Sequence, residues 1–224
     1  MTAHQPEGIL KGRPPNILLY PCNLVGYGRL ILLAGMAGIV YGYHWLGLTL
    51  GSNHRWGIAG GLFVTVLLLD IADGYLARKL GHATKFGAIL DFTIDLLNHT
   101  FVWVLSGLSL APLIIAIEWT AGLLVATFIR EPTHHWKATL LQAGPGLVRV
   151  YFQPMRLNLL NVYSNLAHFA FPISLFVAGQ ITWLSYLMLP GLLVFELVTL
   201  YMIYTFLKIL IAEDDLDTIQ QTDN

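Results

Sequence analysis

Charged side chains are scarce in this chain. Only 11% of its 224 residues are Asp, Glu, Lys or Arg, whereas soluble domains carry about 25%. The single cysteine, Cys22, excludes a secreted scaffold built on internal disulfides. A formal charge of -1 excludes nucleic-acid binding through net positive charge, so no nucleic-acid partner is expected. Hydrophobic residues make up 56% of the sequence, which excludes disorder and predicts an integral membrane protein that spans a lipid bilayer.

Long apolar runs predict six membrane-spanning helices, because about 20 apolar residues cross the hydrocarbon core. The runs cover residues 24–45, 56–77, 86–110, 112–129, 157–178 and 182–211. The polar stretch 130–156, broken by Gly144-Pro145-Gly146, predicts a loop with at most one short helix. The expected fold class is therefore all-α. Its parts are an N-terminal cytoplasmic or interfacial segment (1–20), one six-helix domain (21–212) and an acidic cytoplasmic tail (213–224).

Lysine and arginine are distributed unevenly between the two sides of these spans. Because basic residues accumulate on the cytoplasmic side of membrane proteins, the distribution predicts that both termini are cytoplasmic. Only Arg55 falls on the opposite side. The eleven basic residues on the cytoplasmic side are Lys11, Arg13, Arg29, Arg78, Lys79, Lys85, Arg130, Lys137, Arg149, Arg156 and Lys208.

Four carboxylates lie in or beside the second and third spans: Asp70, Asp73, Asp91 and Asp95. Each would cost about 2.5 to 3.5 kcal/mol at the centre of a helix in lipid. Their spacing of three and four residues puts each pair on one helix face, and the short connection makes the two helices antiparallel, so the pairs can converge. Converging carboxylates require a cation, and oxygen ligands favour magnesium, manganese or calcium. Four acids are more than one ion with bound water requires, so two ions that bridge a diphosphate explain them better than one ion does.

Three neighbouring residues fit a phosphate ligand. Gly74 and Gly87 lack a Cβ and leave space for close approach, and Arg78 can bind phosphate through two parallel hydrogen bonds. The same acids also fit a proton or cation pathway of a transporter, or a buried network of Asp–Arg ion pairs. Inverted-repeat transporters have a pair of helices broken by glycine or proline at matching positions in their two halves. The sequence shows no such pair, which argues against that kind of transporter.

The arrangement Asp70-x2-Asp73-Gly74-x2-Ala77-Arg78-x8-Gly87-x3-Asp91-x3-Asp95 resembles the signature of the CDP-alcohol phosphatidyltransferases at every fixed position. The resemblance implies a six-helix membrane fold, often homodimeric, with its site at the cytoplasmic side. It also implies transfer of a phosphatidyl group from a CDP-linked donor to an alcohol, with release of CMP.

The resemblance implies roles for particular residues. The four aspartates would bind two divalent cations, magnesium or manganese, and Asp95 would also act as general base. The residues that would contact the CDP-linked donor are Asn23, Gly74, Arg78, Thr84 and Gly87.

A looser resemblance extends over residues 21–176 to the inositol-using branch of that family found in eukaryotes. Residues 23–29, 85–91, 135–137 and 148–152 and Asn165 carry it. It implies CDP-diacylglycerol and inositol as substrates, with Lys137 and Arg149 at the acceptor. Leu96 stands where those enzymes usually have an arginine, so inositol phosphate, glycerol phosphate and serine stay open as acceptors. The membrane would be the endoplasmic reticulum in a eukaryote, or the inner membrane in a bacterium.

Four further polar residues at membrane depth are His99, Glu118, His168 and Glu196. They are interpreted as hydrogen-bonded structure between helices rather than as catalysts or metal ligands. Glu118 could also face the acceptor site.

Overall fold

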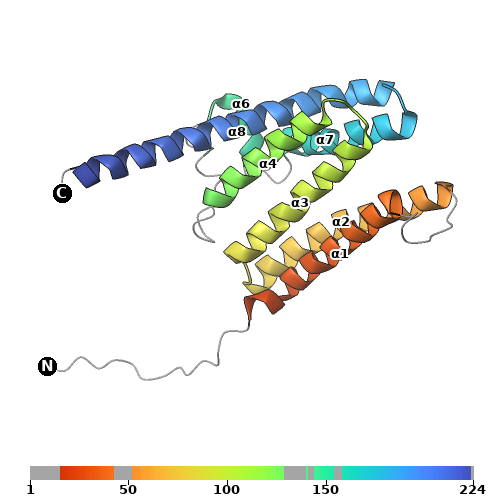
Figure 1. The fold of residues 1–224 in the computed structure, drawn as a ribbon, viewed down its shortest axis with the longest axis horizontal. Coiled ribbons are helices and arrows are strands. Elements are labelled where there is room, and N and C mark those ends of the chain that lie inside the picture. The colour runs from red at the N-terminus through yellow and green to blue at the C-terminus, as the bar shows by residue number, and fades with distance from the viewer. Residues whose placement is uncertain (1–15, 43–51, 129–139, 141–143, 154–157, 223–224) are drawn as a thin grey trace.

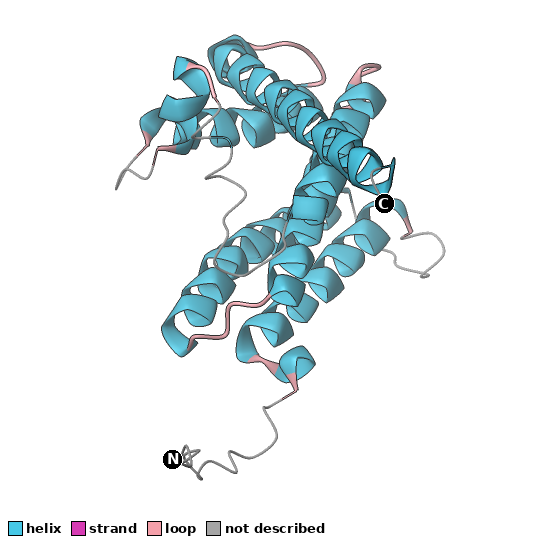
Figure 2. Cartoon of the chain, turned by 90° about the vertical axis from the view of Figure 1, so that its left-hand side faces the viewer, coloured by secondary structure: helices cyan, strands magenta, loops and turns pink. Residues whose placement is uncertain are grey.

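The computed structural model describes residues 16–42, 52–128, 140, 144–153 and 158–222. Every regular element within these residues is a helix, and they contain no strand (Figure 2). Figure 1 shows the elements in chain order, which are η1 (Ile17–Leu19), α1 (Pro21–Tyr41), α2 (Ser52–Leu80), α3 (Lys85–Leu105), α4 (Ala111–Phe128), α6 (Gly146–Phe152), α7 (Leu159–Ala178) and α8 (Trp183–Thr222).

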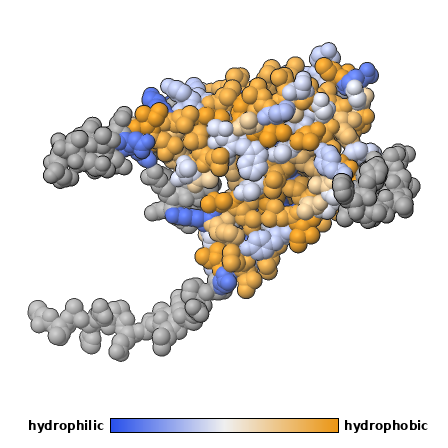
Figure 3. Space-filling model, in the orientation of Figure 1, coloured by the Kyte–Doolittle hydropathy of each residue, from blue (hydrophilic) through white to orange (hydrophobic). Residues whose placement is uncertain are grey.

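Six of these helices are long and apolar enough to cross a membrane, which confirms the predicted fold class. The candidate spans are Pro21–Tyr41, Trp56–Leu80, Lys85–Leu105, Ala111–Phe128, Leu159–Ala178 and Trp183–Asp214. Large apolar side chains lie exposed on the outside of these helices, among them Ile31, Ile71 and Val177. Apolar residues cover most of the face seen in Figure 3. Such a surface suits lipid rather than water.

Most helix ends lie within four residues of those predicted, and two differ by more. The third span ends at Leu105 rather than at residue 110, because Gly107 adopts a positive φ of 66° and forms a turn. The last helix continues to Thr222, through residues that were predicted as a separate acidic tail. No proline or glycine follows Gly191, so nothing in the local sequence stops the helix.

The turn between α2 and α3 has well-defined ends. Gly81 ends α2 with a φ of 66°, and the backbone N–H of His82 donates to the carbonyl of Ala77 at 2.9 Å. Three residues after Gly81, Thr84 caps α3 by accepting a hydrogen bond from the N–H of Gly87 at 3.0 Å. This tight connection makes α2 and α3 antiparallel and leaves the two aspartate pairs on either side of one turn.

Helix α3 is the central helix of the fold. It packs against α1 on one side and against α4 and α7 on the other, while α2 pairs with α1, and α8 pairs with α7 (Figure 1). One apolar cluster joins α1 and α2 and another joins α3, α4 and α8, with Met36 and Trp103 among their most buried members. The charged residues of α3, which are Lys85, Asp91 and Asp95, lie in the half nearest the α2–α3 turn.

Close packing between α7 and α8 depends on Gly191. A Cβ at this position would lie 2.7 Å from the Cβ of Ala167 and 2.9 Å from a ring carbon of Tyr163. We therefore expect Gly191→Ala to lower the free energy of unfolding by about 1 to 3 kcal/mol, measured as a lower thermal midpoint in detergent. Gly61→Ala is the matched control, because a Cβ there would meet nothing within 4 Å. An equal fall in both variants would contradict the packing explanation.

Candidate active site

Arg29 joins the four aspartates into one cluster. Its guanidinium comes from α1, has no exposed surface, and lies 2.8 Å from Asp70, 2.7 Å from Asp73, 2.7 Å from Asp91 and 2.9 Å from Asp95. The carboxylates come in pairs from α2 and α3, as their spacing predicts. The cation that compensates their charge in this structure is thus a side chain of the protein. A buried arginine surrounded by acids also matches the ion-pair network that the residues alone left open.

The aspartates retain the properties of a metal site beside Arg29. One positive charge against four negative charges leaves an excess of acid, and each contact with Arg29 uses one oxygen of a carboxylate. Ligand oxygens of Asp70, Asp91 and Asp95 lie within 4.8 Å of one another. The side chains of these three are 40 to 47% exposed. An all-carboxylate donor set with accessible oxygens fits hard divalent cations such as magnesium or manganese.

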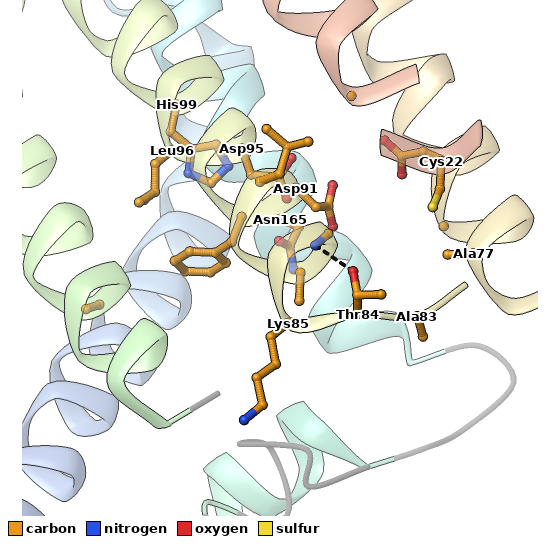
Figure 4. Close-up of a pocket in the computed structure, with 18 of the residues that line it drawn as sticks. Cys22, Ala77, Ala83, Thr84, Lys85, Asp91, Asp95, Leu96, His99 and Asn165 are labelled. Atoms are coloured by element: carbon orange, nitrogen blue, oxygen red, sulfur yellow. Dashed lines mark hydrogen bonds between the residues drawn. The ribbon is translucent and has the colours of Figure 1, made fainter. Parts of the chain in front are cut away.

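A cavity of about 630 Å³ lies beside the cluster. Gly87, Asp91, Asp95 and His99 all line it. These four residues follow one another at four-residue intervals, so they share one face of α3. Figure 4 shows the side chains of Asp91, Asp95 and His99 on successive turns, while Lys85 extends from the start of the helix away from the carboxylates. The cavity therefore follows α3 from the α2–α3 turn inward.

All five residues predicted to contact the donor line this cavity, and the structure also gives each of them a local role. Asn23 donates to the carbonyl of Ile17 at 2.7 Å, which ties η1 to α1. The guanidinium of Arg78 lies over Gly74, where a Cβ would come within 3.2 Å of it. Thr84 caps α3, and a Cβ on Gly87 would lie 3.0 Å from the side-chain oxygen of Asn23. Their contact with a donor remains a prediction.

Of the two predicted acceptor residues, only Arg149 belongs to the described part of the chain. Lys137 lies outside the described residues. Arg149, on α6, donates from Nε to the carbonyl of Gly144 at 2.8 Å and is not among the described residues that line the cavity. Tyr151, two residues further along α6, does line it and accepts a hydrogen bond from Asn165 at 3.1 Å. Burial raises the pKa of Tyr151, so its hydroxyl keeps its proton at neutral pH.

The contacts of Arg29 with the aspartates were not predicted from the sequence, in which Arg29 counts only as an orientation charge. The sequence did contain a signal, because Arg29 lies inside the first predicted span, residues 24–45, and an arginine at membrane depth needs a partner.

The interpretation of His99 and His168 as partners in contacts between helices is confirmed. Both lie against Glu118 of α4, at 3.0 Å and 2.6 Å. His168 also lies 3.4 Å from Glu196 of α8.

Comparison with known proteins identifies the family. The family model described as CDP-alcohol phosphatidyltransferase matches residues 21–207. This chain belongs to the CDP-alcohol phosphatidyltransferase family. The match begins at the first residue of α1, includes all four aspartates and ends within α8.

Curated relatives match a shorter stretch of this family member. Each is named CDP-diacylglycerol–inositol 3-phosphatidyltransferase. The Drosophila melanogaster protein is 35% identical over 80 residues, which are 36% of this chain and 30% of the relative. The Candida albicans protein is 36% identical over 80 residues, with the same shares. The Homo sapiens protein is 34% identical over 80 residues, 36% of this chain and 32% of the relative. The match thus spans about a third of these relatives, and no solved structure matches the chain.

Removal of Arg29 tests the electrostatics of the cluster. In Arg29→Met the four carboxylates lose their internal counter-charge. We expect the free energy of unfolding to fall by roughly 3 kcal/mol, the low end for a broken buried pair, because three of the carboxylates are partly exposed. Thermal midpoints with and without EDTA measure the loss. Added Mg²⁺ should raise the midpoint of this variant more than that of the unchanged protein, since it supplies the missing positive charge.

Two further variants make the Arg29 test specific. Arg78→Met removes an exposed arginine and should shift the midpoint little. Adding Asp91→Asn to Arg29→Met removes one negative charge and should recover part of the loss. Equal midpoints for all these proteins would show that Arg29 does not stabilise the cluster.

Proposed function

We propose that this protein transfers the phosphatidyl group from CDP-diacylglycerol to a hydroxyl of myo-inositol, which forms phosphatidylinositol and releases CMP. The observation that carries the proposal is the cluster of four aspartates beside a cavity whose rim also holds Arg78 and Thr84. Family membership supports the transfer from a CDP-linked donor. The printed names of the matched relatives support inositol as the acceptor.

Donor binding falls to residues near the α2–α3 turn. Asp70, Asp73, Asp91 and Asp95 would hold two divalent cations, magnesium or manganese, which polarise the donor diphosphate when bound. Arg78 would donate hydrogen bonds to phosphate oxygens and stabilise the charge that builds on them. Gly74 and Gly87 lack a Cβ, which lets the polar side chains of Arg78, Asn23 and Thr84 lie close to the helix backbone where the diphosphate would bind. Asn23 and Thr84 would complete the polar wall on the donor side.

The chemical step is a displacement at phosphorus. The acceptor hydroxyl oxygen bonds to the phosphorus that carries the lipid, the bond from that phosphorus to the CMP oxygen breaks, and CMP leaves with the electron pair. Asp95 accepts the hydroxyl proton. A carboxylate beside cations is a weak base, so positioning and charge stabilisation carry most of the catalysis, as in phosphoryl transfer generally.

The proposed setting is a membrane, with the site facing the cytoplasm. The six candidate spans support insertion in a bilayer, and Arg78, Lys79 and Lys85 beside the α2–α3 turn support a cytoplasmic position for the cavity mouth. The related proteins are eukaryotic, which supports the endoplasmic reticulum, and a homodimer is the proposed assembly. A cation or proton transporter that uses the same acids is less well supported, because the family match points to group transfer.

An acceptor survey tests this function. Purified protein in mixed micelles with CDP-diacylglycerol and Mg²⁺ or Mn²⁺ should release CMP when myo-inositol is added, and EDTA should abolish the release. Inositol phosphate, glycerol phosphate and serine should each give less than about a tenth of that rate. CMP release with one of these and not with inositol would retain the family chemistry and reject inositol. No release with any acceptor would contradict the proposed function and favour a transporter.

Asp95→Asn tests the proposed general base. The amide cannot accept the hydroxyl proton and also loses a cation ligand, so we expect kcat to fall by at least about a hundredfold. Binding of the donor should persist in part, measured with a non-reacting CDP analogue. Asp214→Asn is the control, because Asp214 lies on the exposed end of α8 and should leave kcat unchanged. Full activity in Asp95→Asn would remove Asp95 from the mechanism.

A further inference from the structure

The inner end of the cavity lies one helical turn beyond the aspartates. His99 follows Asp95 by four residues on the same face of α3, which is a rise of about 6 Å. Both residues line the cavity (Figure 4). Glu118 of α4 and Phe195 of α8 also line it. An acceptor whose reacting hydroxyl is held at Asp95 therefore has the space beside His99 for the rest of its ring.

A carboxylate is fixed at this inner end. Glu118 is only 4% exposed, and its two oxygens lie 3.0 Å from Nδ1 of His99 and 2.6 Å from Nε2 of His168. His168 is itself completely buried, is stacked on Phe195, and lies 2.9 Å from the indole nitrogen of Trp103. A carboxylate offers about four acceptor positions. The hydrogen bond with His99 orients Glu118, and the oxygen that contacts His168 has no hydrogen-bond partner among the described residues, so it keeps acceptor positions for a ligand.

Neutral polar side chains also line the cavity. Asn165 and Tyr151, which are hydrogen-bonded to each other at 3.1 Å, supply an amide and a hydroxyl to the cavity wall. Among the described residues that line the cavity, lysine and arginine occur only at Arg78 and Lys85. Both belong to the helix ends at the α2–α3 turn. The basic residues that line the cavity thus lie at its mouth, beside the aspartates, whereas the inner end holds the carboxylate of Glu118.

We infer that the inner end is the acceptor subsite, in which Glu118, oriented by His99 and His168, selects an uncharged polyol and rejects acceptors that carry a phosphate. This inference rests on the proposed function and names the residues that give it its specificity. Ring hydroxyls of a polyol donate to Glu118 in charge-assisted hydrogen bonds. A phosphate in the same place would meet a buried carboxylate and no described lysine or arginine. Repulsion between these like charges would disfavour the phosphorylated acceptor, which is one way in which a site discriminates between ligands.

The test compares Glu118→Gln with Glu196→Gln. Both replace a buried or half-buried acid that contacts His168, but Glu196 is not among the described residues that line the cavity. In Glu118→Gln we expect the KM for myo-inositol to rise about tenfold or more, with kcat and the KM for CDP-diacylglycerol changed by less than about threefold. The ratio of kcat/KM for inositol phosphate to that for inositol should also rise at least about tenfold. Glu196→Gln should change neither quantity.

Glu118→Asp separates charge from shape and serves where the glutamine variant does not fold. It keeps the anion but shortens the side chain, so the KM for inositol should rise while inositol phosphate is still rejected. A change in selectivity equal to that of Glu118→Gln would overturn the charge argument. Unchanged KM and selectivity in both Glu118 variants, or equal effects in Glu196→Gln, would overturn the subsite.

Failure of the proposed function can be distinguished from failure of the subsite by measuring CMP release and inositol binding in the unchanged protein. If the unchanged protein releases CMP only with a phosphorylated acceptor, the inositol assignment and the inference both fall. If it releases no CMP at all, equilibrium binding of radiolabelled myo-inositol, measured with CMP and Mg²⁺, decides the subsite alone. Binding that is lost in Glu118→Gln and kept in Glu196→Gln supports it, and no binding to the unchanged protein overturns it.

Discussion

The contact between Arg29 and the four aspartates is the constraint on which the rest of this structure depends. Charges at membrane depth are costly unless they are paired, and here one buried guanidinium contacts carboxylates from two other helices at 2.7 to 2.9 Å. The contact therefore fixes α1 against α2 and α3 at the polar end of the fold. It also sets the carboxylate positions without using all their oxygens, so the same arrangement that stabilises the protein preserves a donor set for divalent cations.

Residues at four-residue intervals along α3 extend the site from the aspartate cluster to the inner end of the cavity. Gly87, Asp91, Asp95 and His99 line the cavity in that order from the mouth inward. In our account the donor diphosphate lies at the mouth, where Arg78, Asn23 and Thr84 lie close to the two glycines, and the acceptor lies beyond Asp95. The anionic donor and the neutral polyol acceptor then bind in separate parts of the cavity whose charged residues differ, and they meet at the donor phosphorus.

The sequence predicted most of the fold because hydropathy and turn chemistry act locally. Apolar runs specify the spans, and the spacing of the aspartates specifies the faces they share. Two kinds of feature depend on contacts between distant segments and were harder to predict. Arg29 lies 41 residues before Asp70, the nearest of its aspartate partners in the sequence, so its sequence neighbours do not show what it binds. Likewise, Glu118 was left between a structural role and the acceptor site, because only the fold brings His99 and His168 to its two oxygens.

The most direct test of the central claim is to locate bound cations by anomalous scattering from crystals of the protein grown with Mn²⁺ and CDP-diacylglycerol. The account predicts two manganese peaks about 3.5–4 Å apart, both in contact with carboxylates of Asp70, Asp73, Asp91 and Asp95 and with the donor diphosphate between them. Arg29 should remain against the same carboxylates. Aspartates that hold no manganese, or that line a continuous water-filled path with no space for a diphosphate, would contradict it.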